Sequence, residues 1–370
     1  MSPMRFLLFL GLLFSSGCSL TSTLFPSLPE SRQLVELSDA ELFAVRPDGE
    51  MLAYVADGLN ILRLTDRYQQ RLTYDSPEAL IWAPDGRSLV AAFREAEKTR
   101  LVRLTSTAAE RSQVLVDEQI TDLAWLTDGR LLAMAQTVEN KDDVVLIRAS
   151  LLIWDGRWDV ERIPLYRKRF RSRAAAGKLV VQHHFDLSPL KDELVYNRYL
   201  DLPTADGRSE LILYNLLSGK ERFLTETGNR QTEAFLAADA ETLLLPVGHR
   251  QVQYMNPWKK EVLSSWQTPG EFLQAAPHSA LFFIDGKVYA DGRLQLTLPF
   301  GSKGRFSEDG ARLFVAWRRK LYLYDDYEVP EQIQFSGVEK AELQRIRQQR
   351  SRGEISIHDY YQSRNNILNP

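Results

Sequence analysis

The stretch FAVRPDGEMLAYVA, residues 43–56, sets a short apolar strand, a Pro-Asp-Gly turn and a second apolar strand in succession. Asp-Gly between two apolar runs predicts a tight β-hairpin, because glycine accepts the positive φ that such a turn requires. The same phrase recurs as LIWAPDGRSLVAAF at 80–93, LAWLTDGRLLAMA at 123–135 and GRFSEDGARLFVAW at 304–317. Weaker copies read FDLSPLKDELVYN at 185–197, FLAADAETLLLPV at 235–247 and FLQAAPHSALFFI at 272–284.

Each hairpin is followed by a third, alternating strand and, in several copies, by a short fourth segment, as at 69–74, 221–226 and 331–335. Four short antiparallel strands repeating about every 43 residues are typical of propeller blades. The seven hairpins therefore predict an all-β, seven-bladed propeller, or a six-bladed one if a weak copy is spurious. The segment SRQLVEL at 31–37 would add an outer strand to the last blade and remove an exposed sheet edge.

The repeated phrase, best matched at 43–54, 80–93 and 304–317, resembles the WD40-like (PD40) repeat of TolB-type periplasmic propellers. The resemblance covers about residues 31–335. It implies a periplasmic propeller that docks other envelope proteins, and it transfers no binding site. An all-β sandwich or barrel with unrelated Pro-Asp-Gly turns is the alternative.

The first eighteen residues, MSPMRFLLFLGLLFSSGC, combine a positive start at Arg5, an apolar run and small residues before Cys18. The run is shorter than the 20 or so residues of a permanent span and is typical of a signal peptide. The ending resembles a bacterial lipobox, although Ser15 stands where leucine is usual. The resemblance implies a signal at 1–17, acylation of Cys18 (palmitate among the acyl chains), a linker at 18–30 and a tether to the outer membrane facing the periplasm. An ordinary cleaved signal is the alternative.

The composition is that of a globular protein, with 44% hydrophobic and 10% aromatic residues. The formal charge is −3, and it becomes −4 when the signal takes Arg5 away. This balance argues against nucleic-acid binding, which needs a basic surface. Cys18 is the only cysteine, so no disulfide can form within the chain.

Residues of about 137–180 interrupt the repeat and are predicted to form an insertion. The densest positive patch of the chain lies there, at Arg167, Lys168, Arg169, Arg171 and Arg173. One interpretation is a contact site for an anionic partner, because clustered cations attract anionic surfaces. The other is a solvated hairpin flank whose arginine stems cover apolar surface.

The tail, residues 336–370, changes to helical spacing. Ser336 and Glu339 predict a capping box, and Gly353 predicts the end of the first helix. A second helix follows Ser356. The pair resembles the short two-helix (SHOCT-like) C-terminal module of many bacterial proteins, which implies assembly or oligomerisation. Partner contacts are expected at Leu343, Ile346, Tyr360 and Tyr361, although packing on the propeller is the alternative.

The sequence contains no G-x-S-x-G, P-loop, GxGxxG, HExxH or CxxCH motif. The histidine pair His183-His184, with Asp186, is the only cluster that suggests a metal, and one strand segment cannot aim three ligands at one point. We therefore expect no catalytic residue, no metal and no cofactor.

The expected function is a lipid-anchored, non-enzymatic docking or assembly component of the cell envelope. Two alternatives are open. The first is a recognition module for envelope polymer or lipid headgroups that uses the arginine-rich insertion. The second is a lactonase- or glycan-hydrolase-like propeller enzyme with its site in the central channel, because a fold does not decide its function.

Overall fold

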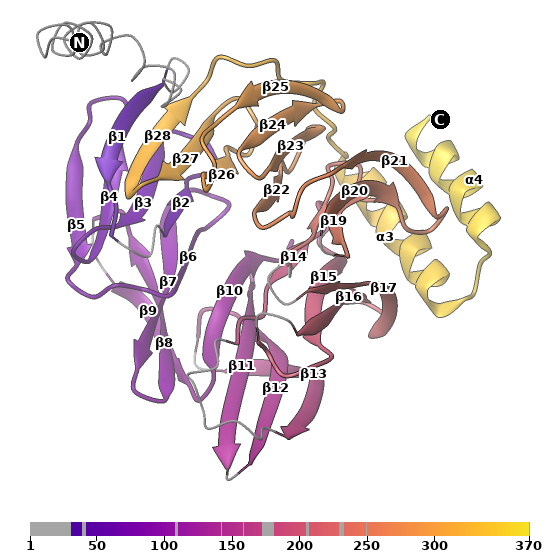
Figure 1. Ribbon diagram of the computed structural model, residues 1–370, viewed down its shortest axis with the longest axis horizontal. Coiled ribbons are helices and arrows are strands. Elements are labelled where there is room, and N and C mark those ends of the chain that lie inside the picture. The colour runs from indigo at the N-terminus through magenta and orange to yellow at the C-terminus, as the bar shows by residue number, and fades with distance from the viewer. Residues whose placement is uncertain are drawn as a thin grey trace, which may run out of the picture.

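The computed structural model describes residues 31–38, 42–107, 110–141, 143–157, 159–171, 181–204, 207–228, 233–248 and 250–369. Their strands form seven four-stranded antiparallel sheets arranged in a ring (Figure 1). The predicted seven-bladed propeller is confirmed, and the six-bladed alternative is wrong. The predicted signal, Cys18 and the linker at 18–30 lie outside the described residues.

Blades 1 to 6 follow one another along the chain, each starting with its innermost strand. Blades 1 and 2 consist of β2 (Phe43–Val45), β3 (Met51–Val55), β4 (Leu59–Arg63), β5 (Gln69–Thr73), β6 (Ala79–Trp82), β7 (Ser88–Glu95), β8 (Lys98–Thr105) and β9 (Glu110–Val116). Blades 3 and 4 consist of β10 (Gln119–Trp125), β11 (Leu131–Lys141), β12 (Val144–Trp154), β13 (Val160–Arg171), β14 (Phe185–Leu187), β15 (Glu193–Tyr199), β16 (Arg208–Asn215) and β17 (Lys220–Gly228). Blades 5 and 6 consist of β18 (Phe235–Leu236), β19 (Leu243–Val247), β20 (Gln251–Asn256), β21 (Glu261–Trp266), β22 (Leu273–Ala275), β23 (Leu281–Ile284), β24 (Lys287–Ala290) and β25 (Arg293–Thr297).

Blade 7 joins the two ends of the propeller. Its strands are β26 (Lys303–Phe306), β27 (Leu313–Trp317), β28 (Lys320–Tyr324) and, on the outside, β1 (Arg32–Glu36). The predicted outer strand at 31–37 is therefore confirmed. The expectation of a fourth strand at 331–335 is wrong, because β1 occupies the free edge of β28 and leaves those residues without a partner strand.

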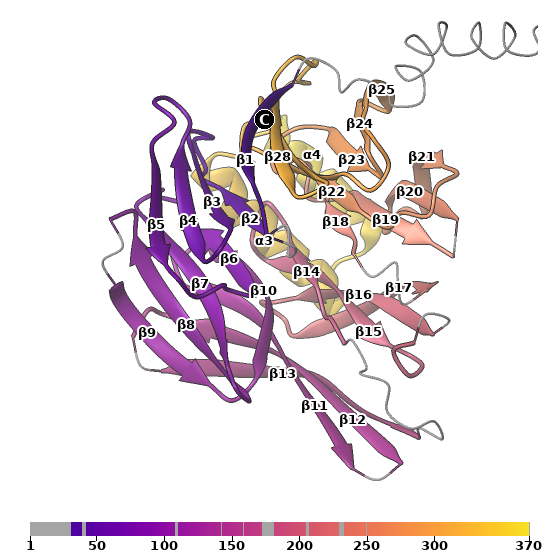
Figure 2. The same cartoon turned by 60° about the vertical axis from the view of Figure 1, so that its left-hand side comes forward.

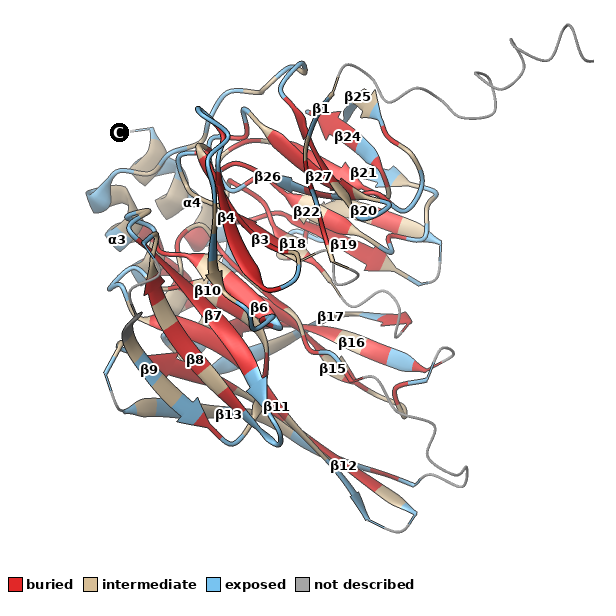
Figure 3. Cartoon of the chain, turned by 90° about the vertical axis from the view of Figure 1, so that its left-hand side faces the viewer, coloured by how far each residue is buried: buried red, intermediate tan, exposed pale blue. Residues whose placement is uncertain are grey.

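The core is divided among seven layers, one between each pair of neighbouring blades. Strand β3 shows why the strand after each turn is almost wholly apolar. Leu52 and Tyr54 pack against blade 7, whereas Ala53 and Val55 pack against blade 2, so both faces of the strand are buried. Figure 3 shows buried residues along the middle strands and exposed ones on outer strands such as β9.

The Asp-Gly turns have the geometry that the sequence predicts. In blade 1, the Asp48 carboxylate accepts a hydrogen bond from the Glu50 amide at 3.0 Å, and Gly49 has φ +70°. Blades 4 and 5 make the same turn without glycine, with Lys191 at φ +60° and Ala240 at φ +57°. These two copies were weak in sequence, but they form full blades.

The predicted insertion is built into blade 3. Strands β11, β12 and β13 are 11 to 12 residues long, and their ends extend beyond the ring as an arm (Figure 2). We use "the arm" for residues 136–141, 143–148 and 166–171. Phe170, Val145 and Ile147 form a small separate core that packs against Val181 and Tyr199.

The tail forms two helices, α3 (Gly337–Arg352) and α4 (Ile357–Leu368). Ser336 and Glu339 make the predicted capping box, and Gly353 ends α3 with φ +75°. Leu343, Ile346 and Tyr360 pack on Leu190 and Ala240, in the turns of blades 4 and 5. The helices thus cover part of one face of the propeller, over blades 4 and 5. No helix in the described ranges is long and apolar enough to cross a bilayer.

Ring closure gives the first testable prediction. Val35 is 7% exposed in the layer between blades 7 and 1, whereas Gln33 on the same strand is exposed. Replacing Val35 by aspartate should cost about 2–4 kcal/mol of unfolding free energy, because it buries an unpaired carboxylate. Gln33→Asp should cost less than about 0.5 kcal/mol. Equal urea-unfolding midpoints for the two variants would contradict closure through β1.

Candidate functional site

The contact between tail and propeller is the most heavily charged buried part of the molecule. Arg347 is 0% exposed and is the largest fully buried side chain in the described residues. Its Nε lies 3.1 Å from an Asp192 carboxylate oxygen, a terminal nitrogen pairs with Glu193, and the other donates to the Ala240 carbonyl at 2.7 Å. The guanidinium therefore ties α3 to the turns of blades 4 and 5.

Arg350 extends this network one turn further along α3. Its terminal nitrogens lie 3.4 Å from Glu193 and 3.2 Å from Glu241. The guanidinium stacks between two rings, at 3.6 Å from the Trp258 centroid and 4.0 Å from the Tyr360 centroid. Tyr360 donates its hydroxyl hydrogen to Glu241.

The charges in this network come close to balance. Burial works to raise the pKa of Glu193, but Arg347 and Arg350 outweigh it and hold that pKa below its usual value. Burial raises the pKa of Asp192, whose carboxylate also accepts from Ser188 at 2.9 Å. Two guanidinium groups thus face three carboxyl groups, those of Asp192, Glu193 and Glu241, and this pairing limits the cost of burying charge.

The expected partner contacts at Leu343, Ile346 and Tyr360 are therefore wrong. These side chains are at most 2% exposed, because they fill the contact with the propeller. Tyr361 is only partly buried, but its hydroxyl donates to Glu241 at 3.1 Å and also lies within hydrogen-bonding distance of Asn256. The tail is a part of the folded propeller in this structure.

The arginine-rich segment forms the arm end of β13, and its side chains divide into two sets. Arg167, Arg169 and Arg171 are exposed and alternate along the strand, so they share one face. In the described part of the chain, none of the three has an acidic group within ion-pair distance. Lys168 points the other way, donates to the Leu200 carbonyl at 2.7 Å and lies over the Phe170 ring. Arg173 lies outside the described residues.

The histidine pair is split between two roles. His183 is 0% exposed, with one ring nitrogen 2.7 Å from the Gln136 amide oxygen and the other bonded to the Tyr166 hydroxyl. Burial lowers its pKa to about 3, so the ring is neutral. Both nitrogens are engaged, which leaves none for a metal.

His184 belongs to a charged cluster near the innermost strands of blades 3 to 5. Its Nδ1 lies 3.7 Å from Asp122 and its Nε2 3.8 Å from Glu233. Burial opposes protonation, but the two carboxylates outweigh it and raise the pKa of His184 to about 9. The ring is therefore protonated at neutral pH and has no lone pair with which to act as a base or a metal ligand.

Asp186, which the sequence analysis considered together with His183 and His184, links two blades. Its carboxylate accepts the Leu236 amide at 2.8 Å and so links blade 4 to blade 5, while burial raises its pKa to about 7. Asp122 makes the equivalent link from blade 3 to the Phe185 amide at 3.3 Å. In the described ranges, no three histidine, cysteine, aspartate or glutamate side chains gather as a metal site.

Sequence reasoning missed Asp122 and Glu233 as neighbours of His184. They are 62 and 49 positions away along the chain, and only the ring brings the three together. It also missed the acidic residues of the propeller that pair with Arg347 and Arg350 of the tail. The signal that was available is the presence of Asp192, Glu193 and Glu241 next to the weak turns.

Comparison with known proteins supports the fold and nothing finer. The sequence matches no family model and no curated protein. Among solved structures, it is similar to the Dos1 propeller, with 12% identity over 82% of this chain and 96% of that one and a TM-score of 0.50. It is also similar to the Cps50 (Swd1) β-propeller domain of Myceliophteria thermophila, with 13% identity over 80% and 99% and a TM-score of 0.52. At these identities the likeness shows a propeller fold alone.

The buried network gives a stability prediction. Arg347→Met should lower the unfolding free energy by about 3–5 kcal/mol, because it leaves Asp192 buried without an ion-pair partner and Glu193 with Arg350 alone. Arg345→Met is the matched control on the same helix, since Arg345 is exposed and, among the described residues, pairs with Glu342 alone. It should change stability by less than about 0.5 kcal/mol.

Adding Asp192→Asn and Glu193→Gln to Arg347→Met should recover part of the loss, because the stranded charges are then gone. Urea unfolding, followed by circular dichroism, gives the unfolding free energies of the wild type, the two single variants and the combined variant. A wild-type midpoint for Arg347→Met would show that the network does not hold the tail.

Proposed function

We propose that this protein is a lipid-anchored component of the bacterial cell envelope that docks another protein through the exposed arginine row of its arm. The observation that carries the proposal is the row itself, Arg167, Arg169 and Arg171. Three cations stand on one face of one strand without an ion pair to any described residue, and the one acidic residue on that face of the arm, Glu139, is paired with Arg148.

Several other arginines of the propeller are neutralised by ion pairs, whereas those of the row are not. Arg130, Arg162 and Arg208 each lie 2.6–2.8 Å from a carboxylate of the same chain. Side chains two apart on a strand are about 7 Å from each other, so the charges of the row repel one another until an anionic surface approaches. A guanidinium binds carboxylates with two parallel hydrogen bonds, which favours an acidic protein surface as the partner.

The position of the arm agrees with a protein partner. Blade 3 lies across the ring from blade 7, which carries β1 and the chain leading to the proposed anchor (Figures 1 and 2). Residues 18–30 can reach at most about 45 Å when extended. A tether at Cys18 with this reach would leave the arm, on the far side of the ring from β1, accessible to other proteins of the envelope.

Anchoring by Cys18 rests on the lipobox-like ending of the signal, and it has its own test. Cys18→Ser should move the protein from the membrane fraction to the soluble fraction, or leave it with the mass of the unprocessed chain, because a serine offers no thiol for acylation. Stable anchoring needs more than one acyl chain, as the lipobox resemblance implies. An unchanged distribution and mature mass would contradict the anchor.

The docking role is tested by charge reversal. The variant Arg167→Glu, Arg169→Glu, Arg171→Glu should lose its partner in affinity isolation from solubilised envelopes, with at least a tenfold drop in recovery. The control reverses Arg32, Arg87 and Arg293, which are exposed elsewhere and give the same change of net charge. It should retain the partner.

An identical set of co-purified proteins for wild type, arm variant and control would contradict the proposal. Retained protein binding with lost binding to anionic vesicles would instead favour recognition of lipid headgroups, the alternative that uses the same residues.

A further inference from the structure

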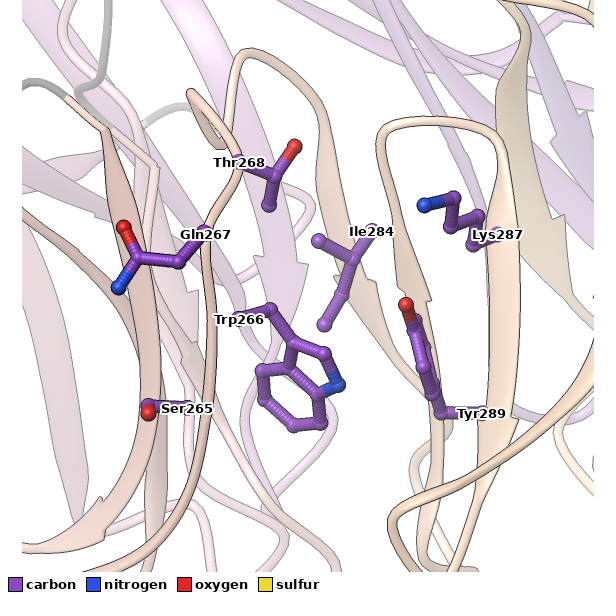
Figure 4. A pocket seen from close by; sticks show the side chains of 7 residues that line it. All are labelled: Ser265, Trp266, Gln267, Thr268, Ile284, Lys287 and Tyr289. Atoms are coloured by element: carbon purple, nitrogen blue, oxygen red, sulfur yellow. The ribbon is translucent and has the colours of Figure 1, made fainter.

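A cleft of about 260 Å³ lies between the outer parts of blades 5 and 6 (Figure 4). Its apolar floor is formed by Trp266 on β21, Ile284 on β23 and Tyr289 on β24. The Trp266 and Tyr289 rings are 5.0 Å apart between centroids and inclined at 49°. Trp266 is partly exposed, so part of its indole ring is accessible from the cleft that it lines.

The rim of the cleft carries polar groups that have no hydrogen-bond or ion-pair partner among the described residues. Lys287 and Gln267 are exposed and have no ion-pair or hydrogen-bond partner among the described residues. The Trp266 indole N–H and the Tyr289 hydroxyl also have no hydrogen-bond partner among the described residues, and Tyr289 is buried at 8% exposure. Figure 4 shows Lys287 and Tyr289 on one side and Gln267 and Thr268 on the other. No carboxylate lines the cleft, so its only formal charge is the Lys287 ammonium.

The loop that follows Trp266 forms one wall of the cleft, and hydrogen bonds to Asp285 hold it in place. The Asp285 carboxylate accepts from the Thr268 hydroxyl at 2.6 Å, the Gly270 amide at 2.7 Å and the Phe272 amide at 2.9 Å. Three hydrogen bonds to one carboxylate fix the loop that follows Trp266. A ligand therefore meets a wall that is already ordered, which reduces the entropic cost of binding.

We infer that this cleft binds an acidic saccharide, that is, a sugar ring bearing a carboxylate. The C–H face of a sugar ring packs on the flat Trp266 ring, and its hydroxyls both donate to and accept from Gln267 and Tyr289. The carboxylate pairs with Lys287. A peptide end with an apolar side chain fits less well, because it would cover these polar groups without replacing their hydrogen bonds to water.

The test uses the full chain and isothermal titration with an oligogalacturonate as the probe, next to an uncharged oligosaccharide of the same length. The acidic probe should bind at least tenfold more tightly than the uncharged one. Lys287→Glu should weaken it at least tenfold, and Gln267→Ala should weaken it measurably. Both side chains are exposed, so neither change should affect folding. Lys220→Glu, an exposed lysine on blade 4, is the control and should bind like wild type.

No binding at millimolar probe, or equal affinities for wild type and Lys287→Glu, would overturn the inference. Tighter binding of a peptide with a free C-terminal carboxylate, displacing the saccharide, would overturn it in favour of a peptide site. The arm variant should bind the saccharide normally, because the cleft lies on other blades. The outcomes for the cleft and for the docking role are therefore independent.

Discussion

The pairing of β1 with β28 is the constraint on which the rest of the molecule depends. A propeller blade buries its two faces against its neighbours, so an open array would expose one face and one sheet edge at each end. Here the chain's first described strand completes its last blade, and the layer between blades 7 and 1 contains residues from both ends of the ring. Arg312 adds a polar link, donating to the Gly49 carbonyl at 2.8 Å and pairing with Glu50 at 2.8 Å.

Once the ring is closed, one face of it is partly covered by the tail. The repeats that depart from Pro-Asp-Gly in blades 4 and 5 are those on which the tail packs. Leu190 occupies the place of the turn aspartate and contacts the tail core, while Ala240 occupies the place of glycine and accepts a hydrogen bond from Arg347. The turns of blades 4 and 5 thus depart from the repeat sequence at the positions where they contact α3 and α4.

The strands and turns of blades 1, 2, 3 and 7 could be predicted from local sequence, because each of these hairpins is specified within about fourteen residues by an Asp-Gly turn between two apolar strands. The helix ends followed from Ser336 and Gly353 for the same reason. Three groupings could not be predicted in this way: the carboxylates around His184, the acidic residues around Arg347 and the cleft at Trp266. Each of them consists of residues from neighbouring blades or from distant parts of the chain, so no local sequence pattern indicates it. The tail was misjudged for this reason: its apolar face indicated a partner, and the partner is the propeller itself.

Because the apolar face of the tail is packed on the propeller, the exposed arginine row of the arm is the surface to which we assign docking, and this is the central claim. The most direct test is photo-cross-linking in intact cells from a photoreactive side chain at Asn140, which is exposed on the arm, with Gln69 on blade 1 as the reference position. Docking through the arm predicts a discrete adduct with one envelope protein from position 140, lost when the arginine row is reversed. Adducts from position 69 alone, with none from position 140, would contradict it.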